Sequence, residues 1–165
     1  MIVIGYQGIG KSTLAEKDNN YIDLESGNFW VNNKRSSNWY KVYCNIAENL
    51  SKQGFIVFTS SHKEVRDEFK SRGTKNVIVC YPGLELKNEW ISKLEKRYKE
   101  TNLIKDYKAL MNAKEMYDKN ITDISADVQF THVIIHKMSY VLEDMLTHEL
   151  EYFMTKYENH CSDTY

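Results

Sequence analysis

The residues with the clearest chemical signature form one short segment near the start of the chain, residues 5–12. Their order, Gly-Tyr-Gln-Gly-Ile-Gly-Lys-Ser, matches the phosphate-binding pattern G-x-x-x-x-G-K-[ST] at every defined position. Glycines let a backbone curl so that successive N–H groups face a phosphate, and the dipole of a following helix adds positive potential. The pattern predicts phosphate contacts from Gly8, Ile9, Gly10, Lys11, Ser12 and Thr13.

Two members of this segment have specific chemistry to offer a bound triphosphate. Lys11 can reach the β- and γ-phosphates, and the Ser12 hydroxyl can bind Mg²⁺. The flanking residues fit this interpretation, since residues 1–4 are typical of a buried strand and residues 11–16 of the opening of a helix. A chance glycine-rich turn is the alternative, and nothing in it requires these flanks. We therefore expect the chain to bind a nucleoside triphosphate.

Length and composition set the class of protein. A chain of 165 residues fits one domain, and 42% hydrophobic with 27% charged residues is typical of a soluble globular protein. The formal net charge of −1 gives no basic field for a long nucleic acid, and no apolar run approaches the ~20 residues of a membrane span. Three widely spaced cysteines and the lack of a leader favour the cytoplasm. We expect one domain over 1–158 and a polar tail over 159–165.

Hydrophobic periodicity predicts strands that alternate with helices along the rest of the chain. Strands that are apolar on both faces are typical of a parallel sheet covered by helices on both sides, so we expect a three-layer α/β/α fold. Ligands of such sheets bind at the carboxyl ends of the strands. The predicted strands after the first are 21–24, 55–59, 76–81 and 132–136, and the helices that follow the first are 38–53, 62–72, 86–98, 103–117 and 138–157.

The glycine-rich segment and the order of elements together resemble the small P-loop kinases, which act on nucleosides, nucleotides, shikimate or gluconate. The resemblance is specific only over residues 5–13, although it covers the chain in element order. It implies a five-stranded parallel sheet in the order 2-3-1-4-5, phosphoryl transfer from ATP and Mg²⁺, and a helical lid insert at about 84–120. In such kinases a lid cation neutralises the transferring group, which here matches Arg97, with Lys93 one turn earlier.

One acidic residue stands at the carboxyl end of a predicted strand, and it is Asp23. The resemblance implies that an acid at this position contacts the acceptor, so Asp23 is the expected general base or acceptor-orienting residue, with Glu25 as second choice. A loop-capping role for Asp23 is the structural alternative. The third and fourth strands end without an acid, which ATP-hydrolysing motors and switches usually carry to hold Mg²⁺.

Aromatic and basic residues near Asp23 suit an acceptor with a base and a phosphate. Phe29 and Trp30 lie outside any helical periodicity and are candidates for a pocket, with Arg35 as a candidate phosphate anchor. Trp39 and Tyr43 follow a helical stripe, so we expect them in the core. After the third strand, Ser60, His62 and Arg66 are candidates for acceptor binding, whereas Ser61 has the simpler role of a helix cap.

Three hypotheses remain open from the sequence. The first is an ATP-dependent phosphotransferase whose acceptor is a hydroxyl or phosphate of a nucleoside, nucleotide or nucleic-acid end. The second is an ATPase or nucleotide-binding accessory protein without an acceptor, and the third is a kinase of a small metabolite such as a sugar acid. We expect ATP and Mg²⁺ as cofactors, no membrane partner, and no metal at His132 and His136, because no carboxylate or thiolate accompanies them.

Overall fold

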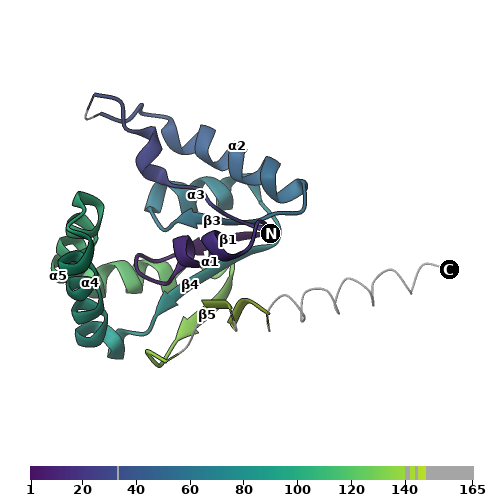
Figure 1. Cartoon of the computed structure of the whole chain (residues 1–165). Helices are drawn as coiled ribbons and strands as arrows, with labels where there is room; N and C mark the ends of the chain where they lie inside the picture. The colour runs from purple at the N-terminus through teal and green to yellow at the C-terminus, as the bar shows by residue number, and fades with distance from the viewer. Residues whose placement is uncertain (33, 140–141, 144, 148–165) are drawn as a thin grey trace.

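The computed structural model describes residues 1–32, 34–139, 142–143 and 145–147. Its centre is a sheet in which all neighbouring strands run parallel, in the order β2-β3-β1-β4-β5 (Figure 1). The predicted α/β class and strand order are thus confirmed. The strands are β1 (Ile2–Gly5), β2 (Tyr21–Asp23), β3 (Ile56–Ser60), β4 (Val77–Pro82) and β5 (Thr131–Ile135).

The register of the sheet brings the ends of its central strands together. Gly5, the last residue of β1, pairs with Ser60 of β3 on one side and with Cys80 of β4 on the other. Because the strands are parallel, the segments that follow Gly5, Ser60 and Pro82 all leave from the same edge. The glycine-rich loop, residues 5–12, therefore starts at the middle of this edge.

The helices predicted up to residue 117 are present in the described part of the chain, with changes at their ends. Glycine or asparagine residues in the left-handed region follow three of them: Gly54 (φ 96°), Gly73 (φ 63°) and Asn102 (φ 50°). The structure has α1 (Lys11–Lys17), η1 (Ser26–Phe29), α2 (Trp39–Lys52), α3 (Lys63–Arg72), η2 (Leu84–Leu86), α4 (Lys87–Thr101) and α5 (Ile104–Ser125).

The prediction for α5 was wrong at its C-terminal end, which lies at Ser125 instead of residue 117. The apolar stripe continues from Tyr117 through Ile121 and Ile124, all of them buried, and this packing sustains the helix through its polar residues. For the predicted helix 138–157, Leu142 and Leu146 are buried, but Val141 and residues 148–157 lie outside the described residues. The predicted tail, 159–165, also lies outside them.

Buried strands make the sheet the rigid base of the molecule. β1 and β4 are buried along their whole length, and Cys44 and Cys80 are free thiols in the core. The helices α4 and α5 run side by side as a hairpin at one end of the molecule, beyond the end of β4 (Figure 1). None of the helices in the described residues combines the length and apolar character that a membrane span requires.

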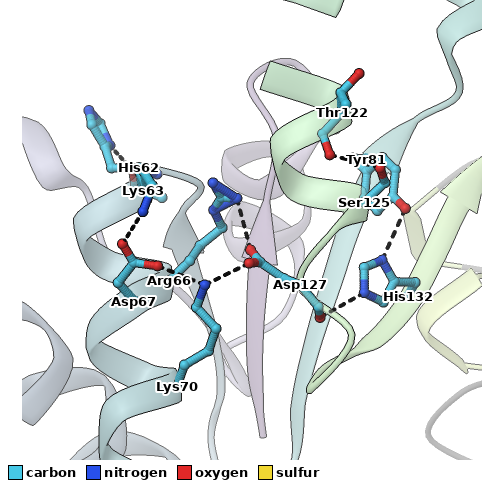
Figure 2. Close-up of polar contacts among 11 residues, drawn as sticks. His62, Lys63, Arg66, Asp67, Lys70, Tyr81, Thr122, Ser125, Asp127 and His132 are labelled. Carbon is cyan, nitrogen blue, oxygen red and sulfur yellow. Dashed lines mark hydrogen bonds and ion pairs between the residues drawn. The ribbon is translucent and has the colours of Figure 1, made fainter. Parts of the chain in front are cut away.

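A buried ion cluster connects α3 to the turn that precedes β5. Arg66 donates from Nη1 to Asp127 Oδ2 at 2.9 Å, and Lys70 donates to the other oxygen of Asp127 at 2.7 Å (Figure 2). Arg66 is only 3% exposed, so this pairing is what makes its burial tolerable. The backbone carbonyl of Asp127 contacts His132, whose other ring nitrogen contacts the Tyr81 hydroxyl.

We expect Asp127→Asn to lower the free energy of unfolding by about 3–5 kcal/mol, because two cations then lose their buried counter-charge. Asp67→Asn is the matched control, since Asp67 pairs with Lys63 and Lys70 near the surface, where such a pair contributes less than about 1 kcal/mol. Urea unfolding of both variants measures the difference. Equal losses in the two variants would contradict a structural role for the cluster.

Candidate functional site

The glycine-rich loop takes a backbone path that only glycine allows at two positions. Gly8 has φ 86° and Gly10 has φ 105°, both in the left-handed region, and Gly10 is the N-cap of α1. A Cβ atom on Gly8 would also lie 2.9 Å from Leu94 Cδ2. The loop is therefore shaped by its glycines and by the close approach of α4.

Lys11 folds back over the start of the loop. Its Nζ donates to the backbone carbonyls of Gly5 at 2.9 Å and Tyr6 at 3.3 Å. Burial lowers the pKa of Lys11, the charge of Arg97 adds to this, and the carboxylates of Asp23 and Glu25 oppose it. Lys11 forms no ion pair within the described part of the chain, so its ammonium group has hydrogen-bond capacity left for an anion.

Ser12 and Asp23 are in direct contact. The Ser12 hydroxyl donates to Asp23 Oδ2 at 2.6 Å, which joins the start of α1 to the end of β2. This hydrogen bond places the carboxylate predicted to serve the acceptor against the hydroxyl predicted to bind Mg²⁺. The two oxygens form one polar group beside Lys11.

Helices α4 and α5 hold the loop from the other side. Trp90 of α4 donates from Nε1 to the carbonyl of Gln7 at 2.9 Å, and both Trp90 and Leu94 are 1% exposed. The Gln7 side chain in turn donates to Ala109 O at 2.8 Å and to Asn112 Oδ1 at 3.2 Å on α5. The segment predicted to be a lid is thus packed on the loop along this part of α4.

A cavity of about 490 Å³ opens beside the loop, between α1, α4 and residues 138, 139, 142 and 143. Its size falls within the usual range for small-molecule sites. Apolar side chains at positions 14, 94, 138 and 142 line it together with Glu100 and Glu143. Its remaining charged lining is basic and consists of Lys17, Lys93, Lys96 and Arg97.

Arg97 lies at this cavity but is held by a partner on α5. Its Nη2 contacts Asp106 Oδ1 at 2.7 Å, and Asp106 also accepts from the Thr101 hydroxyl at 2.6 Å. The Nε of Arg97 is buried and has no hydrogen-bond partner among the described residues. One donor of the guanidinium group is therefore unused.

Arg35 and two tryptophans form a second group, between β2 and α2. The guanidinium carbon of Arg35 lies 4.1 Å from the Trp39 ring centre and 4.9 Å from that of Trp30. Its Nη2 donates to the backbone oxygen of Ser26 at 2.8 Å and to the Ser26 hydroxyl at 3.2 Å. The guanidinium group is thereby fixed in position.

His62 connects this group to the end of β3. Its Nε2 lies 3.5 Å from Arg35 Nη1, and its Nδ1 is hydrogen-bonded to Ser60 Oγ. Burial lowers the pKa of His62, and the charges of Arg35 and Lys11 lower it further, against the opposing effect of Glu64. The imidazole is therefore neutral at pH 7.

The N-terminal part of α5 reaches the same region from across the sheet edge. Lys105 Nζ lies 3.3 Å from Glu25 Oε1, and Lys108 Nζ lies 5.5 Å from the Trp30 ring centre. These contacts bring two further cations to the segment after β2. Trp30 itself is 49% exposed, so part of its ring stays open to solvent beside Arg35 and Lys108.

The structure brings together most of the residues predicted for the site. Lys11, Ser12 and Asp23 form one group, Arg97 shares the cavity with Gly8 and Thr13, and Trp30, Arg35 and His62 form another. Phe29 instead packs on Trp39 and Tyr43, with ring centres 5.9 and 5.4 Å apart.

Arg66 lies apart from these groups. It points from α3 toward Asp127, while His62 stands at the start of the helix (Figure 2). Sequence reasoning did not assign Trp90, Gln7, Lys105 or Lys108 to the site. Trp90 follows the ordinary apolar stripe of α4, so its hydrogen bond to the loop leaves no signal in the sequence.

Within the described ranges, no group of three or more His, Cys, Asp or Glu side chains is arranged to hold a metal ion. No family model matches the chain, and no curated protein matches it either.

The pKa of His62 predicts a specific pH dependence of stability. As the pH falls below about 6.5, the unfolded chain binds a proton at His62 before the folded protein does, so the free energy of unfolding decreases. Above that pH both states are neutral at this residue, and it contributes no dependence.

When the pH is lowered from 7.5 to 5.5, we expect the free energy of unfolding to decrease less in His62→Asn than in the parent. Urea unfolding at both pH values measures this difference. His136→Asn is the matched control, because His136 lies at the surface against Glu85. A parent and a His62→Asn variant with equal pH dependence would contradict the proposed neutrality of the His62 ring.

Proposed function

We propose that the protein is an ATP-dependent phosphotransferase with a P-loop kinase site. The observation that carries the proposal is the position of Lys11 between two groups of residues that could bind ligands. The basic cavity beside α4 lies at one side of the loop, and its Arg97 is close enough to affect the pKa of Lys11. The second group contains Asp23 and His62. Asp23 raises the pKa of Lys11, and the charge of Lys11 lowers the pKa of His62.

The backbone of the loop supports the phosphate-binding role. In the described structure, the backbone N–H groups of residues 7, 8 and 10–13 donate to no other protein group. Unsatisfied N–H groups at a helix N-terminus, preceded by a glycine-rich turn, form a site for phosphate oxygens. Lys11 adds a charge that bridges the β- and γ-phosphates in this arrangement.

The site also fits Mg²⁺, since this ion prefers oxygen ligands and usually keeps several waters while it binds substrate phosphates. We propose that the Ser12 hydroxyl is the direct ligand and that Asp23 holds Ser12 and a metal-bound water, given their 2.6 Å hydrogen bond. Asp23 then supplies the acid that is missing from the ends of β3 and β4. A bound Mg²⁺ would neutralise charge on the transferring phosphoryl group.

The cavity beside α4 suits the nucleoside part of ATP. Leu94, Met138 and Leu142 offer apolar contacts for a base, while Lys93 and Arg97 face the phosphates. Arg97 lines this cavity while its Nη2 stays paired with Asp106. We propose that the moving part of the lid is the α4–α5 turn and its neighbours, because Trp90 and Leu94 fix the middle of α4 to the loop.

Turnover of ATP by purified protein, with and without pooled nucleosides and nucleotides, tests the proposal. Acceptor-dependent formation of ADP and a phosphorylated product is the expected result. Slow turnover that no acceptor stimulates would favour the ATPase alternative. Binding without any turnover would favour a nucleotide-binding accessory protein.

We expect Asp23→Asn to weaken ATP binding about tenfold or more when Mg²⁺ is present, and little in EDTA, since loss of an outer-shell partner costs roughly 10–100-fold in metal affinity. Glu25→Gln is the matched control, because Glu25 pairs with Lys105 and not with Ser12. Calorimetric titration with ATP under both conditions measures the effect. An equal loss with and without Mg²⁺ would contradict the metal role.

A further inference from the structure

Arg35 differs from the other arginines of the protein in its partners. The sequence has arginines at positions 35, 66, 72 and 97. Arg66, Arg72 and Arg97 each pair with a carboxylate, whereas Arg35 has no carboxylate partner in the described structure. Burial lowers the pKa of Arg35 and the more distant Glu64 opposes this, but no carboxylate of the described residues forms an ion pair with the group, so an added anion would stabilise it.

The group is also pre-organised for an anion. Two aromatic rings and Ser26 fix the plane of Arg35, and its Nε is buried without a hydrogen-bond partner. Nη1 contacts His62 with one N–H and carries a second, which a guanidinium group held in a fixed plane can donate to a phosphate oxygen. Such rigidity reduces the entropy that is lost when a ligand binds.

The hydrogen bond from Arg35 to His62 determines whether the Ser60 hydroxyl donates or accepts. Arg35 can only donate, so His62 Nε2 accepts and its Nδ1–H donates to Ser60 Oγ. The backbone N–H of His62 also donates to Ser60 Oγ, at 3.3 Å. The oxygen of Ser60 thus accepts twice, and its own proton is free to donate to a ligand.

This anion site lies beside the glycine-rich loop. Ser60 pairs with Gly5 in the sheet, and Lys105 and Lys108 bring further positive charge from α5. The half-exposed ring of Trp30 can contact an aromatic base next to the anion. A phosphate together with a base is the chemistry of a nucleotide.

We propose that Arg35 and Ser60 bind the phosphate of the acceptor, and that the acceptor is a nucleoside monophosphate stacked on Trp30. This inference rests on the proposed function. In the reaction, an oxygen of the acceptor phosphate forms a bond to the γ-phosphorus of ATP. The bond from that phosphorus to the β–γ bridging oxygen breaks, and ADP leaves with the electron pair.

A monophosphate acceptor also agrees with the position of Asp23. The attacking oxygen of a dianionic phosphate carries no proton, so the step requires no general base. Because no base is needed, Asp23, which accepts a hydrogen bond from Ser12, can serve the metal instead. A nucleoside acceptor would instead need a base for its hydroxyl proton.

Calorimetric titration in the presence of saturating ADP and Mg²⁺ tests the acceptor class. We expect at least one of AMP, GMP, CMP, UMP and their deoxy forms to bind roughly tenfold or more tightly than its nucleoside and than ribose 5-phosphate. Arg35→Lys and Ser60→Ala each weaken that binding about tenfold, and only slightly that of the nucleoside. Lys75→Gln, an exposed charge loss at the opposite edge of the sheet, leaves it unchanged.

Nucleosides or ribose 5-phosphate that bind as tightly as the monophosphates would overturn the inference, as would Ser60→Ala and Arg35→Lys variants with parental affinity. Binding of ADP and Mg²⁺ is measured first in each variant. Retained ADP binding with no monophosphate binding rejects the acceptor class and leaves the proposed function standing. If the parent protein does not bind ADP and Mg²⁺ at all, the proposed function is rejected as well.

Discussion

The ammonium group of Lys11, buried without a carboxylate partner, is the charge on which the arrangement of the site depends. Two backbone carbonyls hold it over the glycine-rich loop and fix its position. They do not neutralise its charge, because neither contact is an ion pair. Asp23 and Glu25 favour the charged form, whereas burial and Arg97 oppose it. A phosphate group would remove this imbalance, because it supplies negative charge at short range.

The loop can hold Lys11 only because the surrounding elements keep its backbone in place. β1 anchors one end in the sheet, α1 begins at the other, and Trp90 fixes the carbonyl of Gln7 between them. Replacement of Gly8 by any larger residue would meet Leu94, so the docking of α4 and the glycine pattern depend on each other. Positional precision of this kind is what phosphoryl transfer requires of a protein.

Periodicity in the sequence predicted the strands along the chain and the start of every helix from α1 to α5 to within a residue or two, because buried stripes and glycine stops are local signals. The order of the strands in the sheet was implied by the resemblance to small P-loop kinases. It could not predict the end of α5, where tertiary packing of Ile121 and Ile124 extends the helix. It also placed Arg66 among the acceptor residues, since nothing near Arg66 in the sequence reveals its partner Asp127, 61 residues away.

In the candidate site, too, features encoded by neighbouring residues were predictable, whereas contacts between residues far apart in the chain were not. The loop residues 5–12 and Asp23 were found from motif and strand position, but the hydrogen bond between Ser12 and Asp23 comes from the packing of α1 against β2. The separation of Phe29 from Trp30 is similar: both are aromatic neighbours in the chain, yet one packs on Trp39 and Tyr43 and the other is half exposed.

The most direct test of the central claim is a titration of ¹⁵N-labelled protein with ATP and Mg²⁺, followed through the backbone amide shifts. We expect the largest shifts at residues 7–13, whose N–H groups apart from that of Ile9 donate to no other protein group in the described structure, and a strong reduction of these shifts in Lys11→Met. Shifts confined to the far edge of the sheet, around Phe69 and Thr131, or no shifts at millimolar ATP, would contradict the account.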